Sequence, residues 1–290
     1  MSTLYVIATP IGNLEDMTPR AVRTLREADV IAAEDTRHSR GLLNHFEIKT
    51  PMFSCHKFNE GKRGDFFVNA MLEGKSVALI SDAGTPCISD PGHRLVKMAA
   101  DAGIPVVPIC GASAVVSALS ICGEDVSKFT FLGFLPRGKE VLVFLTKVLH
   151  PAETVVFYES PKRIKATLKI LSENFPTARV CLCNDISKKF ERVYRGTADE
   201  VLQEICENPS AEKGEYTCVV NLPPAPEDEN PAEPEDAFTL EAQLVDIMVK
   251  SNCNPKDASQ KLHEKNPKLS KKEIYAAMLK LKTKFSLLEK

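Results

Sequence analysis

The sequence predicts an α/β protein of two domains, followed by a linker and a small helical module. Apolar strands alternate with helical patterns over residues 1–120, which is typical of a mostly parallel sheet covered on both faces. Over residues 121–222, strands follow one another with fewer helices between them, which predicts a mixed second sheet. Residues 223–236 hold five Pro and six acidic residues, a composition typical of an extended linker before the helical module at 237–290.

Buried strands of the first domain are expected at short apolar runs rich in β-branched residues. These runs are residues 3–9, 29–34, 76–81 and 104–109. A helix is expected to begin with Thr18 as its cap and Pro19 in its first turn. Further helical patterns cover residues 41–46, 62–73, 92–102 and 110–120. The polar run at 34–40 is expected to end the second strand as a loop.

In the second domain, the same criteria predict five strands and three helices. The strands are residues 129–135, 154–160, 179–185, 190–197 and 215–222, and the helices are 139–149, 161–175 and 198–207. In the module, apolar residues at helical spacing predict three helices. These cover residues 239–250, 255–265 and 270–285.

The composition is that of an ordinary soluble globular protein, with 43% apolar and 26% charged residues. No apolar run approaches the ~18 residues of a membrane span. The N-terminus lacks the basic segment of a secretory signal. We therefore expect a cytoplasmic protein that does not contact membranes.

The chain contains nine cysteines. Their odd number, the lack of a C-x-x-C pair and the length of the chain argue against a disulfide framework. Buried reduced thiols are expected instead, and no metal site is expected.

The helical module is locally basic, since residues 237–290 hold eleven Lys and six acidic residues. Such lysines can contact RNA phosphates with salt-dependent affinity. A solvated helical face explains the same pattern, so both interpretations stay open. The lysines in question are Lys268, Lys271, Lys272, Lys280, Lys282 and Lys284.

Four polar or Gly/Pro-rich segments follow the predicted parallel strands. They are residues 10–13, 34–40, 81–92 and 110–113. The carboxyl ends of parallel strands meet at one edge of the sheet, where open α/β sheets bind ligands. The sequence has no Walker A motif, and no G-x-G-x-x-G follows a strand, so the usual phosphate and dinucleotide loops are not supported.

The segment SDAGTPCISDPG combines turn residues with hydrogen-bonding side chains. Gly84 permits a ligand to approach the backbone closely, and Asp82 and Thr85 could bind a ribose or an amino acid. A turn without a ligand, in which Ser89 or Asp90 caps the next helix, explains the same residues.

Several motifs occur along the chain in the order ATPIGN, AEDTRHS, SDAGTP, GFLPR, FYESPKR and KGEY. Together, over residues 3–222, they resemble the ribosomal RNA small subunit methyltransferase I family. That family consists of S-adenosylmethionine-dependent ribose 2′-O-methyltransferases with the tetrapyrrole-methylase-like fold. The sequence departs from the family at Cys110 and Ala112, where prolines are common, and after Arg137, where Lys and Arg usually follow.

The resemblance implies that S-adenosylmethionine binds between the two α/β domains. It implies a cytidine in the decoding region of 16S rRNA, in the small ribosomal subunit, as the substrate, and a homodimer without a metal. The residues that it implies for the cofactor are Pro10, Ser81, Asp82, Ala83, Gly84, Thr85, Ile88, Ser113, Ala114 and Tyr158.

A ribose hydroxyl is a weak nucleophile, so a proton acceptor would assist methyl transfer. Titratable residues are densest in the polar run at 34–40, which makes Asp35 or His38 the candidate acceptor and Arg37 a candidate phosphate ligand. Glu159 is a second candidate acceptor. Alignment of the reactants without a dedicated base could also provide the acceleration.

Two other functions fit parts of the sequence. A tetrapyrrole or corrin methyltransferase of the same fold would use the same cofactor loops, but it does not explain the polar run at 34–40 or the Lys-rich module. A non-catalytic ribosome-assembly factor that binds RNA is favoured only by the departures from the family pattern. Retained cofactor binding would count against that second alternative.

Overall fold

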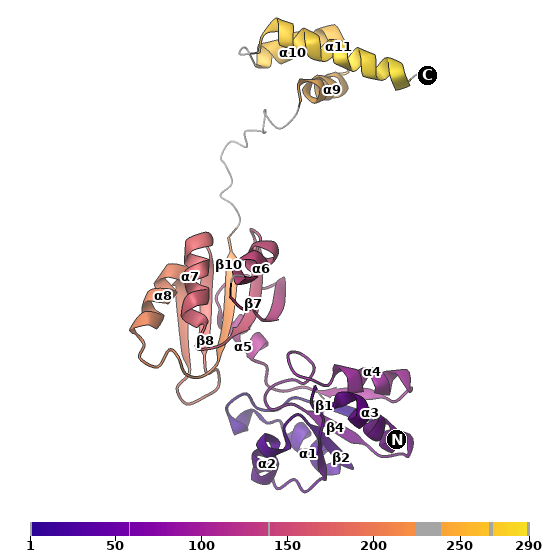
Figure 1. The fold of residues 1–290 in the computed structure, drawn as a ribbon, viewed down its shortest axis with the longest axis vertical. Helices are drawn as coiled ribbons and strands as arrows, with labels where there is room; N and C mark the ends of the chain where they lie inside the picture. Colours follow the sequence, from indigo (N-terminus) through magenta and orange to yellow (C-terminus); the bar gives the residue numbers. More distant parts are fainter. Residues whose placement is uncertain (1, 58, 139, 224–238, 267–268, 289–290) are drawn as a thin grey trace. The chain divides into compact units, whose positions relative to one another are not determined.

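The computed structural model describes residues 2–57, 59–138, 140–223, 239–266 and 269–288 (Figure 1). The chain forms two compact units, residues 1–225 and 226–290. The predicted linker at 223–236 lies outside the described residues, apart from Pro223. Within the described ranges, no helix combines the length and the apolar character needed to cross a bilayer.

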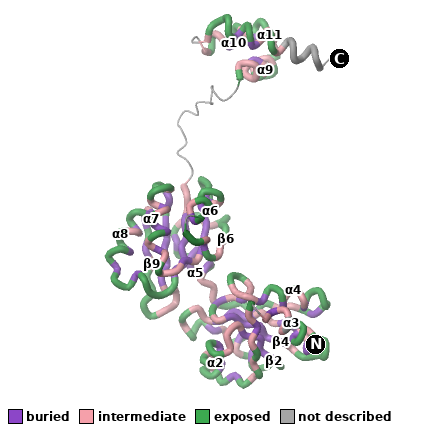
Figure 2. Tube along the Cα trace, viewed as in Figure 1, coloured by how far each residue is buried: buried purple, intermediate pink, exposed green. Residues whose placement is uncertain are grey.

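In the described part of the chain, the first sheet has five parallel strands in the order β3-β2-β4-β1-β5. The strands are β1 (Leu4–Ile7), β2 (Val30–Ala33), β3 (Met52–Ser54), β4 (Val77–Ile80) and β5 (Val106–Ile109). The helices are α1 (Pro19–Glu27), α2 (Thr36–His45), α3 (Glu60–Leu72) and α4 (His93–Asp101), with a short 3-10 helix at Leu14–Asp16. One apolar cluster lies under α1 and α2 and a second lies under α3 and α4, so both faces of the sheet are covered (Figure 2). The predicted parallel sheet is confirmed.

Capping side chains fix where two helices of this sheet begin. Thr18 Oγ1 accepts a hydrogen bond from Ala21 N at 3.1 Å, and Pro19 is the first residue of α1, as predicted. The polar run at 34–40, in contrast, is not a loop. Asp35 caps α2, which begins at Thr36, because an Asp at this position satisfies a free backbone N–H. Strand β3 was also not predicted, since MFS is short and follows a Pro.

The second sheet is mixed, as predicted. Its described strands follow the order β6-β7-β10-β8-β9, in which β6 and β7 are parallel and the other pairs are antiparallel. The strands are β6 (Phe129–Phe134), β7 (Glu153–Glu159), β8 (Arg179–Asn184), β9 (Arg192–Thr197) and β10 (Tyr216–Leu222). Helices α6 (Glu140–Val148), α7 (Ile164–Asn174) and α8 (Ala198–Glu207) share one large apolar cluster with it.

Helix α5 (Ala114–Ile121) packs on the second sheet rather than on the first. Its buried residues Val115, Ala118 and Leu119 form one cluster with Val156 and Val219. The expected domain ranges, 1–120 and 121–222, assign nearly all of this helix to the first domain. We therefore propose a boundary near residue 112, just before α5 begins.

The second unit is a helical module, as predicted. Its helices are α9 (Leu240–Ser251), α10 (Pro255–Lys265) and α11 (Lys271–Leu288). They share a small apolar core formed by Leu244, Ala258, Leu262, Ile274 and Ala277. Thr239 and Asn254 cap α9 and α10.

All nine cysteines are free thiols. Five are buried, but Cys110 and Cys206 are exposed, so the prediction of buried thiols was too general. Among the residues that the structure describes, no group of three or more His, Cys, Asp or Glu is placed to hold a metal ion.

Candidate active site

A cavity of about 380 Å³ lies where the loop after β4 meets residues of the second sheet. Its volume falls within the range of cavities that bind small molecules and cofactors. The lining includes residues 83–85 and 88–90 of the loop, Ser113 and Ala114 at the start of α5, and residues 158–161 and 215–217 of the second sheet. We call it the first cavity.

The backbone of the loop after β4 shapes one wall of the first cavity. Gly84 N and O pair with Thr9 O and N at 3.0 and 2.9 Å, which holds the loop against the end of β1. Gly84 has φ +76°, a conformation that favours glycine. The loop also carries Cys87 at φ 72°. A wall built from backbone at a glycine leaves room for close contact with a bound molecule.

Glu60 anchors the far end of this loop. The sequence did not indicate this role, which becomes apparent from the burial of the residue in the structure. The residue is 5% exposed, and its Oε1 accepts hydrogen bonds from Gly92 N at 2.9 Å and Arg94 N at 3.1 Å. Helix α4 has Gly92 at its cap and no side-chain cap of its own. The expectation that Ser89 or Asp90 caps α4 is therefore wrong. Glu60, from the start of α3, provides that cap instead.

A second cavity of about 320 Å³ lies beside the first. The two share Ile11, Ala83 and Glu215. The remaining lining comes from the loop after β1, from α2, from Ser81 and Asp82 after β4, and from Lys188. Ser39 of α2 is 2% exposed, and its hydroxyl has no hydrogen-bond partner among the described residues. A buried hydroxyl of this kind is costly unless a bound group satisfies it.

The residues predicted for the cofactor fall into two groups. Seven of them line the first cavity: Ala83, Gly84, Thr85, Ile88, Ser113, Ala114 and Tyr158. Pro10, Ser81 and Asp82 line the second cavity, together with Ala83. Ile11, Asp90 and Glu215 also line the first cavity but were not predicted for the cofactor, although they lie in the segments ATPIGN, SDAGTPCISDPG and KGEY.

The candidate catalytic residues of the polar run are not equivalent. Asp35 accepts from Arg37 N at 2.8 Å and pairs with the Arg37 guanidinium at 2.7 Å. These hydrogen bonds hold the pKa of Asp35 far below its usual range, which makes it a poor proton acceptor. The Arg37 side chain is 89% exposed. Only His38 of the three lines the second cavity.

Glu159 lines the first cavity, but its carboxylate is committed to the protein. Oε1 accepts from Ser160 N at 2.6 Å and from Arg163 Nε at 2.7 Å, and Oε2 accepts from Thr167 Oγ1 at 2.8 Å. Its side chain is fully buried. These contacts favour a structural role over that of a proton acceptor.

The wall of the first cavity carries one partly desolvated carboxylate, and a second carboxylate lies near it. Burial raises the pKa of Asp90, which lines the first cavity. Burial also raises the pKa of Glu34, and the nearby Asp90 carboxylate adds to the effect. Burial raises the pKa of the Tyr158 phenol to about 12, so it stays neutral. The Asp90 carboxylate in the wall of the first cavity would complement a cationic ligand.

Comparisons with known proteins agree with this architecture. The family model described as "Tetrapyrrole (Corrin/Porphyrin) Methylases" matches residues 3–202. The solved structure of a cobalt precorrin-4 methyltransferase of cobalamin biosynthesis has a TM-score of 0.55 at 16% identity, covering 76% of this chain and 94% of that one. A Thermus thermophilus uroporphyrin-III C-methyltransferase, solved with S-adenyl homocysteine, has a TM-score of 0.53 at 16% identity, covering 76% of this chain and 97% of that one. At such identities these structures show the shared fold alone.

Curated relatives are much more similar in sequence. Ribosomal RNA small subunit methyltransferase I of Halalkalibacterium halodurans is 46% identical over 75% of this chain and 75% of its own length. The protein of the same name from Synechocystis is 40% identical over 97% of this chain and 99% of its own length, so that match includes the helical module. The chain therefore belongs to the tetrapyrrole methylase family and, within it, to the ribosomal RNA small subunit methyltransferase I family.

Proposed function

We propose that this protein transfers the methyl group of S-adenosylmethionine to the ribose 2′-oxygen of a cytidine in 16S rRNA. The observation that carries the proposal is the 40–46% identity to relatives named as small-subunit rRNA methyltransferases. The two adjacent cavities support it, since this reaction needs a cofactor and an acceptor nucleotide held side by side.

The residues of the first cavity fit S-adenosylmethionine. Gly84 lines the cavity without a side chain, Ser113 and Ala114 open a helix with small side chains, and Asp90 faces the cavity with a partly desolvated carboxylate. A carboxylate in that position complements a cofactor with a positive charge. When bound, the cofactor provides an electrophilic methyl group on a sulfonium. The task of this chain is then to hold the acceptor hydroxyl in line and to exclude water.

The second cavity is the proposed place of the acceptor nucleotide. Ser39 has a buried hydroxyl that lacks a partner in the described structure, and His38 lies beside it on the cavity wall. His38 would accept a hydrogen bond from the ribose hydroxyl as methyl transfer proceeds. Arg37, which is largely exposed, would contact a phosphate.

The His38 role gives a first prediction. His38→Ala should lower the turnover rate about 10–100-fold, the low end of general acid–base effects, while leaving S-adenosylmethionine affinity within about twofold. Single-turnover methyl transfer and calorimetry measure the two quantities. The matched control is His45→Ala at the other end of α2, which should leave both unchanged. An unchanged rate for His38→Ala would leave alignment alone as the basis of catalysis.

Asp90 gives a pH-dependent prediction. Burial raises the pKa of Asp90 in the folded protein, so its ionisation opposes folding, and stability is lost as pH rises through that pKa. Asp90→Asn should therefore raise the melting temperature at pH 7, and the gain should vanish below about pH 4. The same change removes a charge that faces the cofactor, so the affinity should fall roughly three- to tenfold. Higher stability together with unchanged cofactor affinity would remove Asp90 from the site.

The helical module is proposed to dock RNA. Lys271 and Lys272 lie exposed at the start of α11, whereas Lys280 pairs with Glu241 at 3.4 Å. Lys268 and the side chains of Lys282 and Lys284 lie outside the described residues. Reversing both charges, Lys271→Glu and Lys272→Glu, should weaken rRNA binding about tenfold at 0.1 M salt and leave S-adenosylmethionine affinity unchanged. Because the contribution is electrostatic, the difference should close near 0.5 M salt. A difference that does not depend on salt would contradict direct phosphate contacts.

The proposed assembly is a homodimer, as the family resemblance implies. Apolar side chains exposed on the first unit are available to such a contact. They include Val116, Val143 and Phe190. Light scattering of the full chain would give its mass in solution.

The decisive experiment is methyl transfer from labelled S-adenosylmethionine to assembled small ribosomal subunits that lack the modification, with free rRNA alongside. Label on a ribose 2′-oxygen of a cytidine is the expected result. Cofactor binding without transfer to either form of rRNA would contradict the proposal. A corrin precursor, the acceptor suggested by the fold alone, would be the next substrate to test.

A further inference from the structure

We propose that Lys188 is a positioning residue that holds the wall shared by the two cavities. With Asp185 and Glu215 it forms the Lys188 network, which presses against Gly12 in the loop after β1. The inference rests on the proposed function, because it assigns that wall to the placing of cofactor and acceptor. Asp185 ends the predicted strand at 179–185 and Glu215 lies in the KGEY motif, but nothing in the sequence indicated Lys188, because its contacts join distant segments.

The loop that carries Lys188 follows β8 and has an unusual backbone. Asp185 has φ 54° and Ser187 has φ 70°, left-handed conformations that are uncommon outside glycine. Hydrogen bonds hold this loop in place. Asp185 N donates to Glu215 O at 2.9 Å, and Ser187 N donates to Glu191 Oε2 at 2.6 Å. Strained residues fixed by their surroundings in this way cluster at functional sites.

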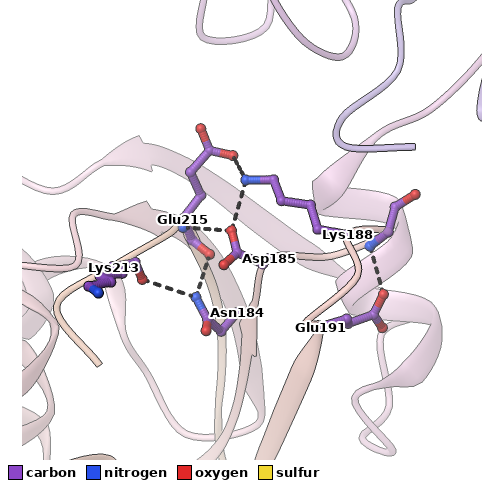
Figure 3. A network of polar contacts seen from close by, with 7 residues as sticks. Asn184, Asp185, Lys188, Glu191, Lys213 and Glu215 are labelled. Carbon is purple, nitrogen blue, oxygen red and sulfur yellow. Dashed lines mark hydrogen bonds and ion pairs between the residues drawn. The ribbon is translucent and has the colours of Figure 1, made fainter. Parts of the chain in front are cut away.

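The ammonium of Lys188 joins the two carboxylates of the network (Figure 3). Its Nζ lies 2.8 Å from Asp185 Oδ1 and 2.8 Å from Glu215 Oε2, and Glu215 N donates to Asp185 Oδ1 at 3.2 Å. Burial works against the charge on Lys188, but the hydrogen bonds to Asp185 and Glu215 outweigh it and raise its pKa. Two of the three N–H groups of the ammonium are engaged by these carboxylates, which fixes the side chain in place, and we therefore assign it to orienting the wall.

The aliphatic stem of Lys188 lies directly on Gly12. A Cβ added to Gly12 would overlap Lys188 Cγ, and it would lie 3.3 Å from Ile186 O, which is a tight contact. Next to this contact, the Ser187 hydroxyl donates to the Asp16 carboxylate. The loop after β1 therefore needs a glycine at position 12, because the loop after β8 passes over it.

This contact lies at the boundary of both cavities. Glu215 and Ile11 line both, Gly12 and Lys188 line the second, and Ile186 lines the first. A shift of the Lys188 network would move Glu215 and Ile186 together. The spacing between the cofactor and the acceptor hydroxyl would then change, and such displacements have large effects on rate.

A double-mutant cycle tests the contact. Gly12→Ala places a methyl group where Lys188 Cγ lies, and Lys188→Ala removes every side-chain atom beyond Cβ. We expect each single change to weaken S-adenosylmethionine binding about five- to tenfold, and the double variant to be within about threefold of Lys188→Ala, since the added methyl then has room. Lys188→Met keeps the stem and removes the charge, so it should not rescue Gly12→Ala. Lys189→Ala, at the next and exposed lysine, is the matched control and should have no effect.

The four proteins of the cycle are compared by two measurements that do not depend on methyl transfer. Calorimetry gives the affinity for S-adenosylmethionine, and thermal unfolding gives the melting temperature. If Gly12→Ala does not fold, recovery of folding in the double variant supports the contact. Losses that simply multiply in the double variant, in affinity or in melting temperature, would overturn it. If the wild-type protein binds cofactor but methylates no rRNA, the proposed function is refuted. The binding and unfolding data would still test the contact between Lys188 and Gly12. A reduced kcat in Lys188→Met, with S-adenosylmethionine affinity equal to that of the wild type, would identify the charged head group as the part that positions the acceptor.

Discussion

Replacing Gly84 by valine should weaken S-adenosylmethionine binding about 100-fold, because the left-handed backbone and a β-branched side chain together cost about 2–3 kcal/mol. Gly84 has φ +76°, and a Cβ there would lie 3.4 Å from Ile11 Cγ2. Its backbone pair with Thr9, which holds the wall of the first cavity, would have to give way. Calorimetry on the folded variant measures the loss directly.

Gly123→Val is the matched control for backbone strain. Gly123 has φ +83°, nothing lies within 4 Å of an added Cβ, and it lines neither cavity. This change should lower the melting temperature without altering cofactor affinity. Equal losses of affinity in the two variants would mean that general destabilisation, and not the shape of the wall, explains the result at Gly84.

Removing the Glu60 carboxylate should lower the melting temperature by about 5–10 °C and weaken cofactor binding as well. Glu60→Ala leaves Gly92 N and Arg94 N without their acceptor. Each unsatisfied buried N–H costs about 1–3 kcal/mol, and 1 kcal/mol corresponds to about 2–4 °C for a unit of this size. The loop that lines the first cavity ends at this anchor, so its conformation should relax along with α4.

Glu60→Gln separates the hydrogen bonds from the charge. The amide oxygen can still accept from both N–H groups, so this variant should keep most of the stability and most of the affinity. Glu73→Ala, at the exposed C-terminal end of the same helix, should have little effect. Damage in Glu60→Gln equal to that in Glu60→Ala would refute the capping role.

Most of the fold could be predicted from local sequence patterns. A buried parallel strand is indicated by a short apolar run, and the start of a helix is indicated by its capping residues. Thr18 and Pro19 start α1 as expected, and the mixed second sheet followed from the order of its strands. The edge strand β3 was missed because three residues carry no periodicity.

The candidate site was predicted where it follows from topology and missed where it follows from packing. The loop after β4 had to lie at the carboxyl edge of the sheet, so its residues lined the cavity as expected. Hydrogen bonds from Arg37 and Arg163 engage the carboxylates of Asp35 and Glu159, and local sequence did not indicate these contacts. Glu60 reaches across to α4, and Lys188 reaches to Gly12, through helix and loop contacts that no local spacing encodes.

The position of β10 has a consequence for how the protein is made. This strand is the last of the first unit along the chain, yet it lies between β7 and β8. A nascent chain that ends before β10 leaves the facing edges of both strands unpaired, and the wall formed by residues 215–217 is missing. The second sheet and the first cavity are therefore completed only when β10 has been synthesised and pairs between β7 and β8. A ligand of that cavity binds only finished chains, and by binding them it draws the folding equilibrium toward completion.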